Sequence, residues 1–222
     1  MKARAPGPPS VAVGIAVAAG AALLRARSLR WGATDGEVEM VLPGDELVPR
    51  ADLTATRAIT VRASAADGVW PWIAQLGQAR GGFYSYDFLE NLMGCDVHSA
   101  NRVVPEWQRI EVGAQVNLHP KLALTAALVE PERTLVLRGG VPIGGAPPPY
   151  DFTWAFVLCD QPDATTRLVV RERYRYSRRW APLVVEPVEL ISFVMSRRMM
   201  RGIKERAERA VAPAPTSSRT AL

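Results

Sequence analysis

The 222-residue chain is 48% hydrophobic and 22% charged, a composition typical of globular proteins that excludes a wholly disordered chain. Its length suits one domain with short extensions. The net charge of +5 belongs to residues 1–30, which carry five basic side chains and no acidic one. No nucleic-acid-binding motif accompanies this charge, so no nucleic-acid partner is predicted. Cys95 and Cys159 lie far apart and in no metal-ligand spacing, so no metal or cofactor is predicted.

An apolar segment, VAVGIAVAAGAALL, occupies residues 11–24 and is followed by the arginine-rich run RARSLR. As a helix at ~1.5 Å per residue it covers about two-thirds of a ~30 Å hydrocarbon core, and flanking arginines can extend its reach. We therefore predict that the basic leader, residues 1–30, anchors the protein to a membrane or associates with one. A cleaved signal peptide and a disordered leader on a cytoplasmic protein are the alternatives.

The folded part opens with a strand and an interrupted helix. Residues 56–63, TRAITVRA, alternate apolar and polar side chains, which predicts a half-buried strand. Ser64 stands three residues before Asp67, the spacing of a helix-capping pair. Pro71 follows, and its ring removes a backbone donor. We expect a helix that is kinked at Pro71 or that begins later than the cap indicates.

Residues 78–94, QARGGFYSYDFLENLMG, combine aromatic, acidic and amide side chains. Tyr84 and Tyr86 can bury their rings while their hydroxyls find partners at a cavity rim. Helical spacing predicts a short amphipathic helix with the apolar stripe Phe88, Leu89, Leu92 and Met93 and the opposite polar side Asp87, Glu90 and Asn91. We interpret the polar side as holding a pocket entrance rather than performing chemistry.

Two β-hairpins follow, at residues 124–139 around the turn EPER and at residues 152–176 around DQPDAT. The Gly- and Pro-rich stretch between them, residues 139–151, is predicted to be a long loop at the mouth of the sheet. In the last strand Val170, Glu172 and Tyr174 share the inward face, and the arginine-rich face opposite is expected to be wet. Glu172 would be costly among apolar neighbours unless it is paired, protonated or able to reach water.

The preceding strand places Trp154 and Phe156 on one face, as an aromatic wall. A helix of about 20 residues is then predicted within residues 186–209, with Pro187 in its first turn. Its apolar stripe consists of Val188, Ile191, Met195, Met199 and Ile203. Residues 211–222 are expected to be a disordered tail.

The order of strand, broken helices, antiparallel strands and long final helix predicts an α+β fold. The segments TRAITVRASAADGVWPWIAQLGQARGGFYSYDFLENLMG, NRVVPEWQRIEVGAQVNL and FVMSRRMMRGIKERA resemble actinobacterial members of the SRPBCC superfamily, which are START-like or polyketide-cyclase-like proteins. The resemblance covers residues 31–209. It implies a helix-grip domain over residues 31–210, with a curved antiparallel sheet wrapped around the C-terminal helix.

The resemblance also implies a cavity between sheet and helix that holds a hydrophobic or amphipathic small molecule such as a lipid or polyketide. The predicted ligand-binding residues are Tyr84, Tyr86, Trp154, Phe156, Val170, Glu172, Tyr174, Met195 and Met199. No catalytic set is predicted, because neither His98 nor His119 belongs to a known catalytic motif. The alternatives are a cyclase-like enzyme using Glu172 with Tyr174 or Tyr84, and a membrane-tethered interaction protein without a ligand.

Overall fold

The computed structural model describes residues 8–142 and 145–211. The first seven residues of the predicted leader and the tail from residue 212 onward lie outside the described residues. The elements in chain order are α1 (Pro8–Leu29), α2 (Asp35–Glu39), η1 (Asp45–Leu47), β1 (Leu53–Val61), η2 (Ala65–Val69), α3 (Trp70–Ala74), α4 (Asp87–Leu92), η3 (Pro105–Trp107), β2 (Gln115–His119), β3 (Leu122–Glu130), β4 (Thr134–Gly139), β5 (Tyr150–Asp160), β6 (Thr166–Tyr176) and α5 (Pro182–Val211).

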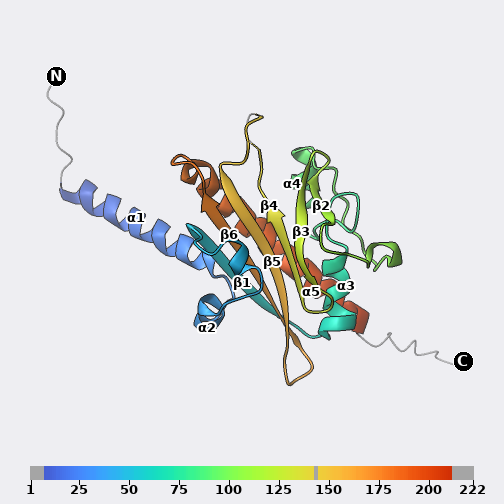
Figure 1. The fold of residues 1–222 in the computed structure, drawn as a ribbon. Helices are drawn as coiled ribbons and strands as arrows, with labels where there is room; N and C mark the ends of the chain where they lie inside the picture. Colours follow the sequence, from blue (N-terminus) through green and yellow to red (C-terminus); the bar gives the residue numbers. More distant parts are fainter. Residues whose placement is uncertain (1–7, 143–144, 212–222) are drawn as a thin grey trace, which may run out of the picture.

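A curved antiparallel sheet of six strands, in the order β1-β6-β5-β4-β3-β2, packs against the long helix α5 (Figure 1). This is the α+β helix-grip arrangement that was predicted. Both predicted hairpins are present as the neighbouring pairs β3–β4 and β5–β6. The last strand, β6, pairs with the first strand, β1, so these two strands lie side by side although they are far apart in sequence.

The inner face of the sheet carries the main core. Phe156 of β5, Leu168 of β6 and Leu137 of β4 point inward and are completely or almost completely buried. Met199 and Ile203 of α5 close this layer from the other side. The predicted alternation in β5 and β6 is confirmed by the register, which places Trp154 opposite Glu172 and Phe156 opposite Val170.

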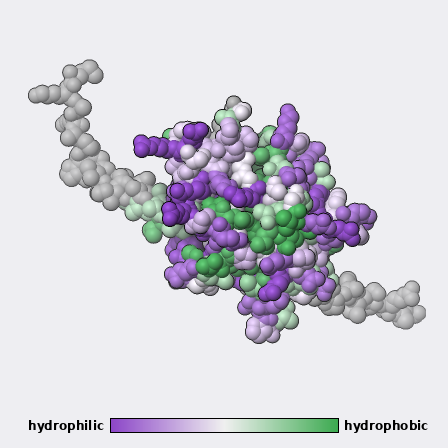
Figure 2. Space-filling view, in the orientation of Figure 1, coloured by the Kyte–Doolittle hydropathy of each residue, from purple (hydrophilic) through white to green (hydrophobic). Residues whose placement is uncertain are grey.

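Residues 31–50 cover part of the outer face of the sheet, so Arg171 is not wet as expected, whereas the side chain of Arg175 is 51% exposed. Arg171 is only 2% exposed and donates hydrogen bonds to the carbonyl oxygens of Glu37, Val38 and Met40. It also contacts Asp45 at 2.6 Å. Figure 2 shows the molecule in the orientation of Figure 1, with hydrophobic residues gathered near the centre of this face and hydrophilic residues around them. The alternation of β6 was predicted correctly, but it could not reveal the segment that covers its outer side.

The helix after β1 begins later than its cap. The Ser64 hydroxyl accepts a hydrogen bond from the backbone N–H of Asp67, as predicted, but the capped turn η2 is a π-helical turn. The α-helix α3 starts at Trp70, with Pro71 in its first turn, where the missing proline N–H costs nothing.

Helix α5 has 30 residues and starts at Pro182, so Pro187 lies inside it rather than in its first turn. The N-terminal part of the predicted apolar stripe is also wrong. Val188 and Ile191 are 45% and 58% exposed, whereas Glu189 is buried. The physical reason is that Arg57 on β1 supplies a buried cationic partner for Glu189, which turns this part of the helix by one position.

Helix α1 includes the apolar segment of residues 11–24 and ends near β1 and α5. Arg25 pairs with Glu186 of α5, and Trp31 lies beneath the guanidinium groups of Arg197 and Arg201. Within the described part of the chain, none of the helices combines the length and apolar character that crossing a bilayer requires.

Candidate functional site: a pocket between the sheet and the terminal helix

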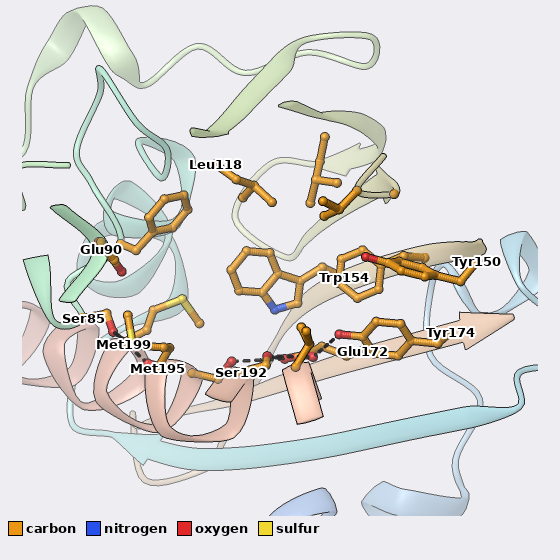
Figure 3. A pocket seen from close by; sticks show the side chains of 17 residues that line it. Ser85, Glu90, Leu118, Tyr150, Trp154, Glu172, Tyr174, Ser192, Met195 and Met199 are labelled. Atoms are coloured by element: carbon orange, nitrogen blue, oxygen red, sulfur yellow. Dashed lines mark hydrogen bonds between the residues drawn. The ribbon is translucent and has the colours of Figure 1, made fainter. Parts of the chain in front are cut away.

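A pocket of about 250 Å³ lies between the inner face of the sheet and the N-terminal half of α5 (Figure 3). This volume is just below the ~300–1,000 Å³ typical of small-molecule sites. The wall is mainly aromatic, aliphatic and thioether, and its residues are Phe83, Ser85, Glu90, Leu118, Leu124, Gly140, Val141, Tyr150, Phe152, Trp154, Glu172, Tyr174, Val188, Ser192, Met195, Ser196 and Met199.

Five of the predicted ligand-binding residues line this pocket together: Trp154, Glu172, Tyr174, Met195 and Met199. They meet because inward positions of β5 and β6 are paired in register and α5 crosses over them. The ring centroids of Phe152 and Tyr174 lie 4.6 Å apart, and those of Tyr150 and Tyr174 lie 5.6 Å apart. Together with Trp154, these rings make the sheet side of the pocket mainly aromatic.

The other four predicted residues lie elsewhere. Phe156 and Val170 are buried in the core cluster farther along β5 and β6, because the inner face is longer than the pocket. Tyr84 is only 1% exposed, and its hydroxyl accepts a hydrogen bond from Gln75 and donates one to the carbonyl oxygen of Trp72. Burial raises the pKa of Tyr84. Tyr86 lines a separate small depression beside Arg197 and Arg201.

Glu172 is held at the floor of the pocket by side chains that all donate to its carboxylate. Arg57 Nη1 lies 2.9 Å from Oε1, Tyr174 donates to Oε2 at 3.0 Å, and Ser196 donates to Oε1 at 3.1 Å. Ser192 lies 2.9 Å from both oxygens. A buried carboxylate with this many donors needs no ligand to satisfy it. The sequence-based alternative that Glu172 pairs with an arginine describes this arrangement.

Arg57 also contacts Glu189 of α5, so one guanidinium serves two buried carboxyl groups. Burial raises the pKa of Glu189, against the lowering effect of Arg57. Burial and the adjacent Glu172 carboxylate raise the pKa of Tyr174 well above its usual value, so its hydroxyl stays a donor. Arg57 further donates to the carbonyl oxygen of Ser28, which connects the network to the end of α1.

Glu90 lines the other side of the pocket, away from Glu172 across Trp154 (Figure 3). Burial, and secondarily the charge of Asp87, raise the pKa of Glu90 to about 7. Its Oε2 atom is buried and has no hydrogen-bond partner among the described residues. Within the same described part of the chain, the indole Nε1 of Trp154 is likewise buried without a partner. Two residues of the pocket wall, Glu90 and Trp154, thus each carry one buried polar atom whose hydrogen bonding is incomplete among the described residues.

The helix that carries Glu90, α4, exposes its apolar side and turns its polar side toward the protein, the reverse of the usual amphipathic arrangement. Phe88, Leu92 and Met93 are about three-quarters exposed, at 75%, 77% and 74%. Asp87 instead accepts hydrogen bonds from the backbone and side chain of Ser99, and Asn91 bonds both backbone groups of Val97. The polar side of α4 therefore faces the protein and holds the loop that follows it.

Sequence reasoning missed the contributions of Arg57 and Glu189 to this site, and it placed Glu90 at a pocket entrance without counting it among the ligand-binding residues. Arg57 shares the inward face of β1 with Ile59, so the strand alternation contained a usable signal for it. Glu189 interrupts an apolar helix and had no such signal. The role of Glu90 depends on the orientation of α4, which its periodicity does not specify. Among the described residues, no cluster of metal-ligating side chains could hold a metal ion.

No family model and no curated protein matches the sequence. Several solved structures are similar in shape to parts of the chain. Protein MLL2253 from Mesorhizobium loti is 15% identical, covers 71% of this chain and 98% of its own, and has a TM-score of 0.42. A norcoclaurine synthase mutant from Thalictrum flavum, bound to a transition-state analogue, is 15% identical over 72% of this chain and 96% of its own, with a TM-score of 0.44. CalU16 from Micromonospora echinospora is 16% identical over 70% of this chain and 84% of its own, with a TM-score of 0.34. At such identities and TM-scores neither a ligand nor a reaction can be transferred, and the function of this chain must be inferred from its own residues.

Proposed function

We propose that the protein binds and carries a small hydrophobic or amphipathic molecule in the pocket between its sheet and α5. The observation that carries this proposal is a pocket with aromatic and methionine walls in which Glu90 Oε2 and Trp154 Nε1 are buried without a hydrogen-bond partner among the described residues. Buried polar groups are normally satisfied, so two unsatisfied atoms on residues of the pocket wall favour a ligand that completes their hydrogen bonding.

The exposed apolar residues at the mouth of the pocket support a role in carrying an apolar molecule. Val141, after β4, and Val188, on α5, line the pocket and are also substantially exposed. An apolar molecule can enter between the loop after β4 and the helix without opening the sheet. Met195 and Met199 on the same side offer flexible thioether surfaces that adapt to different ligand shapes.

Binding of the neutral fluorescent probe N-phenyl-1-naphthylamine tests the proposal. We expect saturable binding to the wild-type protein and at least about tenfold weaker binding after Met195→Trp, because the larger side chain fills the pocket. Met93→Trp is the matched control, since Met93 is exposed and outside the pocket lining. Absence of saturable binding, or equal binding by the Met195→Trp variant, would contradict the proposal.

We further infer that the protein works at a membrane surface. Apolar residues 11–24 precede a domain whose α5 exposes Leu190, Ile191 and Val194 on the helix that flanks the pocket mouth. Leu23 and Leu24 at the end of the apolar segment are also exposed. Apolar helical surfaces flanked by arginines associate with the interface of anionic bilayers. Surface association would place the pocket mouth near the source of an apolar ligand.

A cyclase-like enzyme is the second candidate, and Glu90 favours it. A pKa of about 7 suits a general acid or base at neutral pH, and the carboxyl group faces the pocket. Glu172, by contrast, already accepts hydrogen bonds from four side chains. If a polyketide-like substrate is turned over, Glu90→Gln should reduce kcat by about 10²–10⁴-fold, the usual contribution of one general acid or base.

A further inference from the structure

The charged groups in and beneath the pocket are predominantly acidic. Within the described residues, Glu90 and Glu172 line the pocket and no lysine, arginine or histidine does. Arg57 lies behind the lining and is already shared between Glu172 and Glu189. The carboxyl groups of Glu90, Glu172 and Glu189 thus outnumber the single guanidinium of Arg57 by three to one. A ligand carrying a carboxylate would meet no free cation on the wall, and it would have to approach Glu90.

Glu90 is also a residue of the pocket wall whose hydrogen bonding is incomplete. Its Oε2 is buried without a partner among the described residues, so it requires a hydrogen-bond donor. The two serines at the opposite end of the pocket, Ser192 and Ser196, donate to Glu172 and do not compensate for it. An ammonium or hydroxyl group of a ligand would supply a donor at this position, and an ammonium group would also neutralise the carboxylate.

We propose that the pocket selects small apolar molecules that carry an amino group, bound at Glu90, and rejects molecules that carry a carboxylate. This inference rests on the proposed binding function and specifies its ligand class. The N–H of Trp154, which has no partner among the described residues, belongs to the part of the wall between Glu90 and Glu172 and suits an electron-rich acceptor or ring on the same ligand (Figure 3). An uncharged alcohol should bind with intermediate strength, because it can donate to Glu90 without matching its charge.

The selectivity should strengthen as Glu90 ionises. The groups around Glu90 are Asp87 on its own helix, Cys95 in the following turn, His119 of β2 beside Gly94, and Glu172 across the pocket. Asp87 raises the pKa of Glu90 together with burial, so the carboxyl group loses its proton near pH 7. An aliphatic amine stays protonated through this range, and a carboxylic acid stays ionised. The preference for amine over acid should therefore grow between pH 6 and pH 8.5.

Three probes with the same ring system test the inference: 2-(1-naphthyl)ethylamine, 2-(1-naphthyl)ethanol and 1-naphthylacetic acid, each competing with bound N-phenyl-1-naphthylamine. At pH 8.5 we expect the amine to bind the wild-type protein at least about tenfold more tightly than the acid, with the alcohol between them. Glu90→Gln should reduce the preference of amine over acid to less than about threefold, because the amide cannot carry the charge. Glu106→Gln removes an exposed carboxylate that does not line the pocket, and it should retain the preference.

Each outcome separates this inference from the proposed function. If N-phenyl-1-naphthylamine binds but the acid competes as well as the amine, the selectivity is wrong while the binding function stands. If the amine preference persists unchanged in the Glu90→Gln variant, or is already complete at pH 6, Glu90 is not its source. If none of the probes binds, both the proposed function and the selectivity fail.

Discussion

Glu172 and Glu90 line the same pocket with very different surroundings. Glu172 accepts hydrogen bonds from Arg57, Tyr174 and two serines, so its carboxylate is part of a completed network. Glu90 has only the neighbouring negative charge of Asp87 and an oxygen without a partner among the described residues. The first carboxylate belongs to the structure of the pocket floor, and the second is the one that we propose meets a ligand.

The raised pKa of Glu90 predicts a loss of stability as the pH rises. The folded protein releases this proton at about 7 and the unfolded chain at its usual 4.5. Between these values the folded state holds more protons, so the free energy of unfolding falls with increasing pH until Glu90 is ionised in both states. Glu90 is partly exposed, and after allowance for solvent screening we expect a loss of about 1–2 kcal/mol.

Urea denaturation of the wild type and Glu90→Gln at pH 5 and pH 8 measures this loss. The difference between the two proteins should change by the expected amount, with the wild type losing stability relative to the variant at the higher pH. The Glu106→Gln variant should show the same pH dependence as the wild type. A constant difference between wild type and Glu90→Gln would show that Glu90 ionises normally.

At the scale of elements, one glycine, Gly202, allows α5 to pack closely against the loop after α3. A Cβ atom at Gly202 would lie 2.2 Å from the carbonyl oxygen of Tyr84 and 2.8 Å from its Cβ. Tyr84 itself has a positive φ of 56°, and its ring lies beneath Arg206 of the same helix. This close approach fixes the distance between α5 and the residues that lead into α4, and therefore the shape of the pocket near Glu90.

Gly202→Ala should consequently destabilise the protein although alanine is the better helix former. The added methyl group cannot be accommodated without moving α5 or the Tyr84 backbone, which we expect to cost about 1–3 kcal/mol. Gly36→Ala in α2 is the matched control, because a Cβ there meets no atom within 4 Å. Thermal unfolding of both variants checks the prediction. A Gly202→Ala protein as stable as the Gly36→Ala protein would mean that the helix can shift freely.

At the scale of the whole molecule, the sheet lies between two layers. Helix α5 and α3 cover its inner face, and residues 31–50 cover part of its outer face (Figure 1). Arg167 and Arg171 of β6 hold this outer layer through Glu37 and Asp45. The Glu37 pKa is lowered to about 2, chiefly by its hydrogen bond to Arg167. The chain between the apolar segment and the domain is thus fixed to the sheet, which sets the direction in which α1 leaves the domain.

Flotation with phosphatidylglycerol vesicles tests the proposed membrane association of the whole protein. We expect the full-length chain to float with the vesicles and the double variant Leu23→Asp/Leu24→Asp to bind at least about tenfold more weakly. Burying a leucine side chain in an apolar environment stabilises the bound state by ~1.5–3 kcal/mol. Aspartate removes this stabilisation, and its negative charge is repelled by anionic lipid. Both leucines are exposed, so the substitutions should not disturb folding.

Val112→Asp serves as the control, because Val112 is exposed on the segment before β2 and belongs to neither apolar helical surface. It should float like the wild type. A wild-type protein that stays with the unbound fraction, or a double variant that floats equally well, would contradict membrane association.

The first strand, both hairpins and the terminal helix could be predicted because each depends on a local pattern, whereas β2 was not predicted. Alternation in β5 and β6 also placed Trp154, Glu172 and Tyr174 on one inward face, and the register brought them together. These features are determined within a few residues of each position, where backbone geometry alone decides which side chains share a face.

The tertiary structure decided what covers each face and which partner each charge finds. Arg171 was expected in water, yet residues 37–45 bury it, and Glu189 is turned inward by Arg57, which is 132 residues away in sequence. The inward side of α4 is likewise set by Ser99 and Val97, so that Glu90 reaches the pocket while Phe88 is exposed. The spacing of apolar and polar residues shows that a short helix or strand has two different sides, but it does not decide which side faces the protein. Only packing partners from distant parts of the chain make burial of a charged side less costly than burial of an apolar one, because they supply the hydrogen bonds and opposite charges that replace water.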